Sequence, residues 1–320
     1  METTRPAITA SPRIPLKAAL LLILINLIWA GSSLQGKNAL SALGPYTIAF
    51  LRFGPSALFL FLVAKSRGDR FQIKKSDWPL ILFTGGCGIA LTYGIYYHGL
   101  ASTTAAESTL LIASEPIIVA LAARIMLGER LRAIQQAGLV IGFAGVYLII
   151  AHGLVFRITT GVVANATVIA ALTFECCAAV VAKRLTDTYR WTVVLTLEFG
   201  IGALLLMPGA VWEMSKLTPA SIHWTVWANL AYMSLLCSFF CYAVWYWLLP
   251  KHPVSSMAGF LFIQPMMGPV LAWAFRHEKM GYWTLIGALL VVVGVSLVTV
   301  LKPRNKTLDA ATSMPPQHGG

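Results

Sequence analysis

The sequence has few charged residues for its length. Asp, Glu, Lys and Arg together make up 11% of its 320 residues, while apolar residues make up 58%. Soluble globular domains carry about 25% charged residues. This deficit excludes a soluble globular protein and indicates a chain whose surface largely faces lipid.

Cysteine and histidine, the most versatile metal ligands, are also scarce. The chain has five cysteines and six histidines. Cys237 and Cys241 are spaced to share a helix face, but no histidine or carboxylate accompanies them at ligand spacing. We interpret the cysteines as small buried packing residues and expect neither a metal centre nor another cofactor.

Enzyme motifs are absent as well. The sequence contains no Gly-x-x-x-x-Gly-Lys-Ser/Thr loop, no Gly-x-Ser-x-Gly and no His-Glu-x-x-His. The absence of the first motif is consistent with a function that does not use nucleotide hydrolysis. An integral membrane enzyme acting on lipid is disfavoured, because it needs a nucleophile or metal cluster near the head groups. A channel or scaffold is a further alternative.

What the chain has in abundance is long apolar runs. A helix needs about 20 mostly apolar residues to cross roughly 30 Å of hydrocarbon, and ten stretches meet this requirement. The predicted fold is all-α, with ten transmembrane helices. The predicted spans are Leu16–Leu34, Tyr46–Ala64, Trp78–Tyr97, Thr104–Met126, Ala133–Ala151, Gly161–Ala182, Trp191–Trp212, Val226–Leu249, Val254–Phe275 and Tyr282–Leu301.

The basic residues between these spans predict the orientation. With a cytoplasmic N-terminus, 17 Lys and Arg fall on the cytoplasmic side and five on the other side. This is the positive-inside bias, and an even number of spans brings the C-terminus to the same side. We expect a multi-pass protein of the bacterial inner membrane with both termini cytoplasmic. The net charge of +12 then reflects orientation and not nucleic-acid binding.

The chain ends are distinct from the spans. The basic stub before Leu16 and the small residues at Ala30-Gly31-Ser32-Ser33 resemble a signal peptide, but cleavage there would delete a span whose counterpart recurs later. We therefore expect residues 1–15 to be a cytoplasmic tail. Residues 302–320 have no periodic apolar face and are predicted to be a disordered cytoplasmic tail.

Two parts of the chain repeat one another. We expect the repeats to cover residues 16–151 and 161–301. Because each holds five spans, an odd number, the second copy enters the membrane from the opposite side, as in many transporters. Matching segments are Glu115-Pro116 with Gln264-Pro265, Glu129 with Glu278, Gly138 with Gly287 and Gly145-Val146 with Gly294-Val295 at an offset of 149 residues, and Leu51-Arg52-Phe53-Gly54 with Leu197-Glu198-Phe199-Gly200 at 146.

Several segments together resemble a known family. They are Trp29-Ala30-Gly31-Ser32-Ser33, Leu51-Arg52-Phe53, Glu115-Pro116 and Leu127-Gly128-Glu129-Arg130-Leu131. With ten spans in two repeats, the chain resembles an EamA-type member of the drug/metabolite transporter superfamily. The resemblance implies export of small metabolites, and a central cavity lined by spans one, three, four, six, eight and nine, with spans five and ten outside.

Glu115 is the first candidate site residue. It and its counterpart Gln264 fall near the middle of their spans, each followed by proline. A carboxylate at that depth costs several kcal/mol unless it faces water, a ligand or a partner. We expect Glu115 to bind a substrate amine or carry a proton, and Gln264 to line the same site. The alternative is a protonated Glu115 bonded to a neighbouring helix.

Arg52 and Glu198 are repeat counterparts of opposite charge. We predict coupling or gating roles for both. From a 1.5 Å rise per residue we expect a vertical separation of about 10 Å, which is long for a direct salt bridge. Either water bridges them, in an ion pair that switches during transport, or each has partners in its own half. Glu107 is an alternative partner for Arg52.

The remaining candidates come from comparing further counterparts. Glu175, the counterpart of Trp29, is a second candidate for proton coupling or cation recognition, with a purely structural hydrogen bond as the alternative. Tyr93 and Tyr242 are identical counterparts deep in spans three and eight, and we expect both phenols to face the cavity. Ser32 adds a polar group in span one.

The other aromatic residues lie near span ends, where amphipathic rings anchor to head groups. This position predicts an interfacial belt. Its members are Tyr96, Tyr97, Trp191, Trp212, Trp245, Tyr246, Trp247 and Trp283.

These features together predict a secondary transporter. The carboxylates outnumber the cations at membrane depth, so an amine-bearing substrate, such as an amino acid or a cationic xenobiotic, fits the expected cavity. We expect export by alternating access, with coupling to protons as an option. The expected partners are lipid and a small-molecule substrate, and the protein is expected to be a monomer or homodimer.

Overall fold

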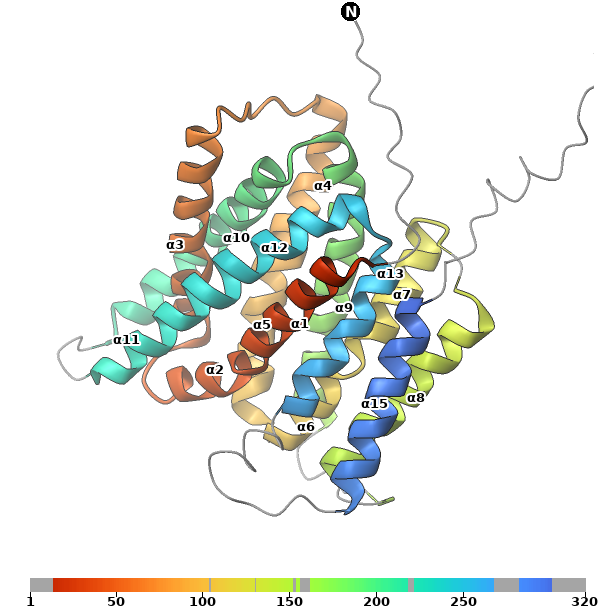
Figure 1. Cartoon of the computed structure of the whole chain (residues 1–320). Helices are drawn as coiled ribbons and strands as arrows, with labels where there is room; N and C mark the ends of the chain where they lie inside the picture. The colour runs from red at the N-terminus through yellow and green to blue at the C-terminus, as the bar shows by residue number, and fades with distance from the viewer. Residues whose placement is uncertain are drawn as a thin grey trace, which may run out of the picture.

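The protein is built from helices. A computed structural model describes residues 14–103, 105–129, 131–151, 154–155, 162–217, 222–267 and 282–300, and these residues form no strand. The chain runs upward and downward through one bundle (Figure 1). Its helices are α1 (Leu16–Ala30), α2 (Ser32–Leu40), α3 (Pro45–Ser66), η1 (Lys75–Asp77), α4 (Trp78–Phe83), η2 (Thr84–Leu91), α5 (Thr92–Ser102), α6 (Ala105–Ile112), α7 (Glu115–Met126), α8 (Ala133–Ala151), α9 (Val162–Thr188), α10 (Trp191–Met214), α11 (Trp224–Ala231), η4 (Tyr232–Phe240), α12 (Cys241–Leu248), η5 (Leu249–Lys251), α13 (Val254–Ala258), η6 (Gly259–Phe262) and α15 (Tyr282–Val300).

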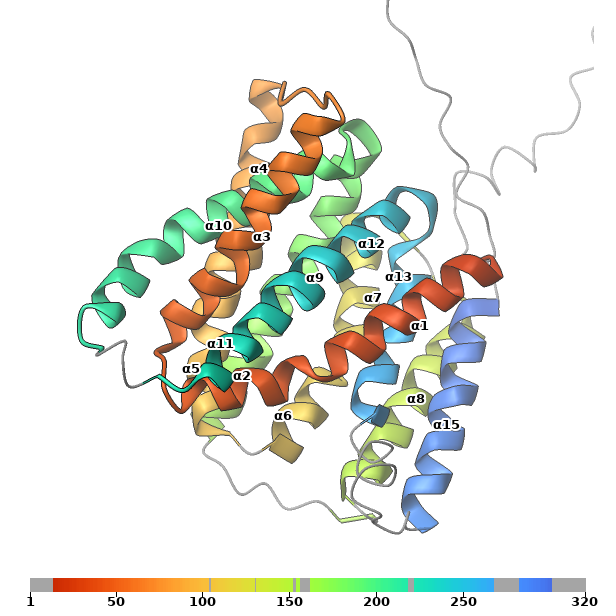
Figure 2. The same cartoon turned by 60° about the vertical axis from the view of Figure 1, so that its left-hand side comes forward.

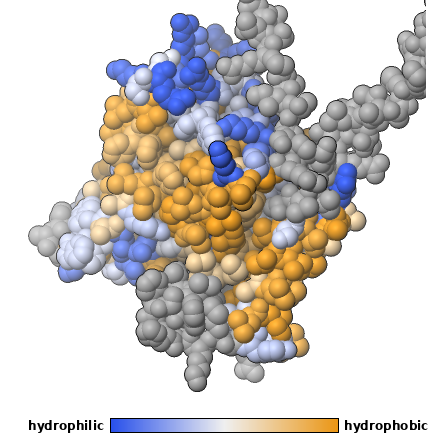
Figure 3. All heavy atoms as spheres, viewed as in Figure 1, coloured by the Kyte–Doolittle hydropathy of each residue, from blue (hydrophilic) through white to orange (hydrophobic). Residues whose placement is uncertain are grey.

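The outer surface of this bundle is suited to lipid. Within the described ranges, six continuous helical stretches are long and apolar enough to cross a membrane, and three shorter apolar helices accompany them. Large apolar side chains such as Leu20, Leu58 and Leu204 are exposed. An apolar band runs across the face seen in Figure 3, and hydrophilic residues gather at its upper end. The prediction of an all-helical membrane protein is therefore confirmed.

Helices α3 and α10 pack along each other, and each begins where the other ends. Helix α3 starts with Pro45, and the Glu213 carboxylate at the end of α10 accepts hydrogen bonds from the backbone N–H groups of Tyr46 and Thr47, at 3.3 and 2.8 Å. At the opposite end, Asp69 accepts hydrogen bonds from Arg190 and Thr192 at the start of α10. The N–H groups at the start of a helix lack partners within it, so the Glu213 carboxylate stabilises the start of α3. Asp69, which follows the end of α3, instead binds the side chains of Arg190 and Thr192 and so links that end to the start of α10.

Helices α8 and α15 form a second close pair, side by side in Figures 1 and 2. A Cβ atom on Gly145 would lie 2.6 Å from the carbonyl oxygen of Gly287, and one on Gly138 would lie 2.9 Å from that of Gly294. Glycine is therefore required where the two backbones touch. Small residues that let two backbones approach closely are a common device of helix packing in membranes.

The helices around the centre of the bundle are interrupted. A turn at Ala113 and Ser114 separates α6 from α7, and Gly31 separates α1 from α2. Two π-helices, η2 and η4, lie between α-helical segments, and η6 is a 3₁₀-helix. Such interruptions inside membrane helices are tolerated where the backbone lines a cavity or is buried in protein, and they are common at functional sites.

Glycine also ends helices where the backbone turns left-handed. Gly68 and Gly128 have φ values of +67° and +69°. They follow α3 and α7, where a residue without Cβ adopts this conformation at no steric cost. The turn at Gly68 brings Asp69 to the start of α10.

Candidate functional site

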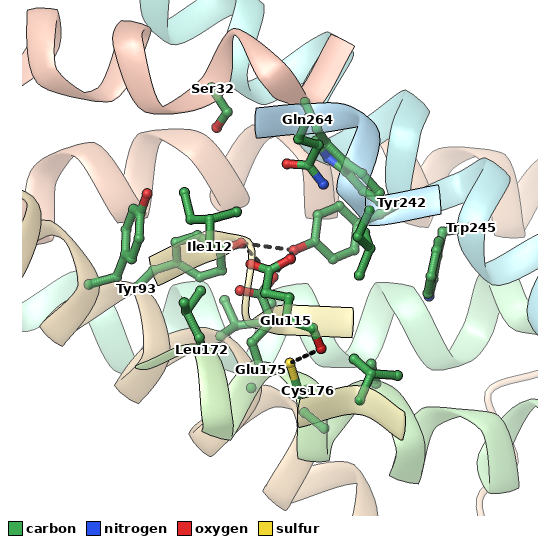
Figure 4. A pocket seen from close by; sticks show the side chains of 18 of the residues that line it. Ser32, Tyr93, Ile112, Glu115, Leu172, Glu175, Cys176, Tyr242, Trp245 and Gln264 are labelled. Carbon is green, nitrogen blue, oxygen red and sulfur yellow. Dashed lines mark hydrogen bonds between the residues drawn. The ribbon is translucent and has the colours of Figure 1, made fainter. Parts of the chain in front are cut away.

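One pocket lies at the centre of the bundle, between the interrupted helices. It offers about 110 Å³ to the centres of water-sized molecules, which is room for several waters or a small solute. The structure brings all nine predicted site residues to its wall, and six of them are labelled in Figure 4. They are Trp29, Ser32, Arg52, Tyr93, Glu115, Glu175, Glu198, Tyr242 and Gln264.

The pocket has contributions from more spans than the family resemblance implied. Spans one, three, four, six, eight and nine all contribute, and no lining residue comes from α8 or α15, as expected. Arg52 and Glu198 come from α3 and α10, which are spans two and seven. These two helices therefore belong to the wall as well, because their mutual packing turns one residue of each toward the centre.

Glu175 is held by two tyrosines in the middle of the pocket. The hydroxyl groups of Tyr93 and Tyr242 donate to the same carboxylate oxygen of Glu175, at 2.7 and 2.5 Å, and lie 2.8 Å from each other (Figure 4). Helices α5, α9 and α12 each supply one member of this cluster. The expectation that both phenols face the cavity agrees with this geometry. Among the described residues, no hydrogen bond reaches the other carboxylate oxygen of Glu175.

Glu115 lies in a different part of its helix than expected. The sequence places it in the middle of a continuous span, but it is the first residue of α7, directly after the turn at Ala113 and Ser114. The chain breaks here because Pro116 has no N–H to continue a helix, and a proline in the first turn begins one instead. The carboxylate is therefore beside the positive end of a half-helix, a position that favours negative charge.

The Glu115 carboxylate is half-buried and lines the pocket. Its backbone carbonyl accepts a weak bond from the Cys176 thiol at 3.9 Å. Among the described residues, no hydrogen bond reaches its side-chain oxygens, so the alternative of a carboxyl that pins a neighbouring helix has no bond to support it. This arrangement leaves the group free to meet a ligand.

Arg52 and Glu198 have separate partners, but those of Arg52 are not confined to its own half of the chain, because its Nε donates to Ser238. The guanidinium of Arg52 donates to the hydroxyl of Tyr97 at 3.2 Å, and the hydroxyl of Tyr246 donates to Glu198 at 2.5 Å. Neither residue is in an ion pair with another described side chain. The side chain of Glu107, the other suggested partner of Arg52, lies outside the described residues.

Trp29, Ser32 and Gln264 complete the wall. The Trp29 indole donates to the carbonyl of Cys237 at 2.8 Å, and its ring packs edge-on against Tyr242 with centroids 5.4 Å apart. Ser32, just after the break at Gly31, accepts from Arg52 at 3.3 Å. Gln264 donates to Asn26 at 3.0 Å, and Asn26 is fully buried.

Four aromatic residues predicted for the interfacial belt are instead buried. Tyr96, Tyr97, Trp245 and Tyr246 are at most 8% exposed, and all but Tyr97 line the pocket. The prediction was wrong because it used only the distance from the span end. Residues 93, 96 and 97, and likewise 242, 245 and 246, share one helix face, so spacing and the repeat together would have located them. Trp212 and Trp247 are exposed, each beneath a lysine ammonium group.

Two further polar residues of the site region were missed. Asn26 holds Gln264, and Ser238 accepts from the Arg52 Nε at 2.9 Å. Both are fully buried. An asparagine inside the apolar run of span one was the available signal, because buried polar groups in a membrane require partners. The described residues contain no group of three or more His, Cys, Asp or Glu side chains able to hold a metal ion.

An all-helical membrane protein with interrupted helices around a central polar pocket belongs, by class, with membrane transporters. The model of the EamA-like transporter family matches this chain twice, at residues 16–151 and 163–300. The chain therefore belongs to the EamA-like transporter family.

Individual relatives agree with this family. An uncharacterized transporter of Archaeoglobus fulgidus is 30% identical over 88% of this chain and 97% of its own length. A probable terminal-alkyne amino-acid exporter of Streptantibioticus cattleyicolor is 26% identical over 88% of this chain and 93% of its own. A crystal structure of another protein matches with a TM-score of 0.72 at 17% identity, over 89% of this chain and 98% of that one, and it shows a shared fold alone.

Proposed function

We propose that this membrane transporter is a secondary-active exporter of small amine-bearing metabolites, either amino acids or xenobiotic compounds, and that it works by alternating access around the central pocket. The observation that carries the proposal is the pair of carboxylates, Glu115 and Glu175, that face one pocket at the break of α6 and α7. No chemical bond of the substrate changes in this function, so the protein is not an enzyme.

An amine fits this pocket for electrostatic and for steric reasons. Among the described residues, three carboxyl side chains, those of Glu115, Glu175 and Glu198, line it against one guanidinium. The rings of Trp29, Tyr242 and Trp245 stand beside them, and aromatic faces attract cations by about 0.5–2 kcal/mol. The name of the Streptantibioticus relative, an amino-acid exporter, is consistent with such a substrate.

The proposed architecture is ten spans in two inverted repeats, residues 16–151 and 161–301. The double match of the family model supports the duplication. Contacts between counterparts support the inversion: Tyr93 touches its counterpart Tyr242, and the rings of Phe53 and Phe199 lie 4.9 Å apart. Counterparts meet only where they lie at the axis that relates the copies.

Pairs of contacts away from the axis support the same symmetry. The bond between Arg52 and Tyr97 becomes that between Glu198 and Tyr246 when counterparts are exchanged. The contact of Gly138 with Gly294 becomes that of Gly287 with Gly145 in the same way. The two π-helices also lie at equivalent places, Thr84–Leu91 and Tyr232–Phe240. A pseudo-two-fold axis in the membrane plane accounts for all of these relations.

The proposed location is the bacterial inner membrane, with both termini cytoplasmic. The excess of basic residues in the connections assigned to the cytoplasm supports this orientation. The two proposed tails, residues 1–15 and 302–320, lie almost wholly outside the described residues. We further propose that the protein works in lipid as a monomer or homodimer, without a cofactor and without nucleic acid.

Proton coupling through Glu115 and Glu175 is part of the proposal. Both carboxyls face the same pocket, so protonation of either one alters the attraction for a cationic substrate. Exchange of a proton for an amine at a shared carboxyl would couple the two fluxes. The alternative within the same architecture is facilitated diffusion, which a pH gradient does not drive.

Counterflow in proteoliposomes tests this proposal. We expect amino acids, polyamines or cationic drugs to exchange across the wild-type protein, at rates that depend on pH. Glu115→Gln should abolish exchange or its pH response, whereas Glu213→Gln, which removes a carboxyl outside the pocket, should keep both. Wild-type exchange and pH response in a folded Glu115→Gln protein would remove Glu115 from the site.

A further inference from the structure

The pocket contains one cation whose charge no described carboxylate neutralises. Arg52 is 3% exposed and lines the pocket. Its hydrogen-bond acceptors are the hydroxyls of Ser32, Ser238 and Tyr97, at 3.3, 2.9 and 3.2 Å. All three are neutral. Its guanidinium also lies over the rings of Phe53 and Tyr93, at 5.1 and 4.7 Å from their centroids.

The contrast with another arginine of the chain makes this arrangement unusual. Arg190, whose side chain is 55% exposed, has a carboxylate partner in Asp69. Water alone would solvate Arg190 well, whereas the buried Arg52 has no anion within 4.0 Å among the described residues. Burying a charge without a partner of opposite charge costs free energy. Such a residue is therefore expected where an anionic ligand binds it during function.

The donors of Arg52 are not all used. Its three hydrogen bonds engage Nε and Nη1, and none engages Nη2 within the described part of the chain. A guanidinium presents five donors in a planar fork that matches a carboxylate. The unused edge is therefore suited to a carboxylate oxygen of a molecule in the pocket.

Tyr93 places this cation close to the carboxylate cluster. Its ring lies beneath the Arg52 guanidinium, and its hydroxyl donates to Glu175 at 2.7 Å. A guanidinium and a carboxylate thus face one cavity across the length of a single tyrosine side chain. The ligand that matches both has an anionic and a cationic group a few bonds apart.

We propose that Arg52 forms a subsite for the carboxylate of the transported molecule, so that the substrate is a zwitterion of the α-amino-acid type, with its ammonium group toward Glu175 and Glu115. This inference rests on the proposed transport function. It separates amino acids from simple amines and cationic drugs, which carry nothing for Arg52 to bind.

A substrate panel on the wild-type protein tests the subsite without any variant. The panel has a radiolabelled amino acid in counterflow, competed by the same unlabelled amino acid, its amide and its decarboxylated amine. Because hydrogen bonds between two charged groups are stronger than those between neutral groups, we expect the acid to compete at least about tenfold better than either analogue. Equal competition by the amide and the amine overturns the subsite while transport stands. If no member of the panel exchanges, transport of amine-bearing compounds fails, and the subsite with it.

Variants then assign the preference to Arg52. In Arg52→Gln we expect the ratio of acid to amide affinity to fall at least about tenfold, toward unity, with exchange or binding of the amine retained. Arg124→Gln, which removes an exposed arginine of α7, should keep the wild-type ratio. A wild-type ratio in Arg52→Gln overturns the assignment, and if this variant does not fold, the wild-type panel still decides.

Glu107 provides a second discriminating variant. In Glu107→Gln the proposal predicts an unchanged preference for the acid over the amide, because the anionic partner of Arg52 is the substrate carboxylate and not Glu107. A clear rise in affinity for the acid would mean that Glu107 neutralises Arg52 in the empty protein, and the proposal would then be wrong.

Discussion

At the scale of single residues, the two hydroxyl groups on Glu175 bind one of its oxygens, and no hydrogen bond reaches the other within the described part of the chain. Tyr93→Phe and Tyr242→Phe each remove one of these donors. We expect each to weaken binding of an amine-bearing substrate by about tenfold, because each bond is made to an acidic group. Competition in counterflow measures this change.

The two tyrosines also contact each other at 2.8 Å, so their effects should not add. In a double-mutant cycle we expect a coupling free energy of at least about 0.5 kcal/mol, the level at which neighbours depart from additivity. Tyr282→Phe, on an exposed ring of α15, is the control and should have no effect. Additive effects of the two pocket variants would show that the tyrosines act independently.

His252, between α12 and α13, predicts a pH dependence of stability. It is 4% exposed, and its Nδ1 has no hydrogen-bond partner among the described residues. Burial, together with the positive charges of Lys183 and Lys251, lowers the pKa of His252 below its usual value near 6.5. The unfolded chain therefore binds a proton at a higher pH than the folded protein does.

From this difference we expect the free energy of unfolding to be highest above about pH 6.5 and to decrease as the pH falls below that value. Thermal unfolding in detergent between pH 5 and 8 measures the change. His252→Asn should flatten this part of the profile, whereas His223→Asn, which replaces an exposed histidine, should not. An unchanged slope in His252→Asn would exclude this histidine as the cause.

The sequence predicted which residues line the pocket because charge and polarity inside apolar spans are rare and have a physical cost. Glu115, Glu175 and Arg52 follow from that rule alone. The same rule could not predict which hydrogen bonds each side chain makes. The two bonds to Glu175 depend on where α5, α9 and α12 meet, and no local sequence pattern encodes that position. Tyr96 and Tyr246 were misplaced because distance from a span end says nothing about which face turns inward.

At the scale of helices, the pair α8 and α15 depends on the absence of side chains at its contacts. Gly145→Val inserts atoms where even a Cβ would lie 2.6 Å from the Gly287 carbonyl oxygen. We expect the free energy of unfolding to fall by about 1–3 kcal/mol, the range for overpacking. Thermal or denaturant unfolding in detergent measures this loss.

Gly200 supplies the matched control for this prediction. It lies within α10, and a Cβ there would meet no atom within 4 Å. Gly200→Ala should therefore keep or raise stability, by up to about 1 kcal/mol, because alanine favours the helix. If Gly145→Val behaves like Gly200→Ala, the close approach of α8 and α15 is not needed for stability.

Apolar length located the helices well and their interruptions poorly. The predicted Ala133–Ala151 coincides with α8, and Trp191–Trp212 differs from α10 by two residues at its end. The turn before Glu115 was missed because Pro116 is compatible with both a kinked helix and a new one. The π-helices were missed because an extra residue per turn leaves no mark on composition, and packing against neighbouring helices decides it.

At the scale of the whole molecule, the proposed symmetry is kept in the scaffold and broken in the pocket. The glycine contacts of α8 with α15 and the ring contact of Phe53 with Phe199 are the same in both copies. Arg52 and Glu198 occupy equivalent places with opposite charge, each beside an equivalent tyrosine. In the proposed mechanism the duplicated scaffold moves between two similar states, and the unequal charges of the pocket orient the substrate.

The inverted arrangement makes a prediction about the position of counterparts relative to the membrane. Ser41 follows α2, and its counterpart Asp187 lies near the end of α9; both are exposed. In a variant whose five cysteines are replaced, we expect Ser41→Cys to react with an impermeant thiol reagent only from the outside, and Asp187→Cys only from the cytoplasmic side. Right-side-out and inside-out vesicles measure this, and detergent-opened vesicles should label both. Reaction of both positions from the same side would mean that the copies run parallel, and the axis in the membrane plane would then be wrong.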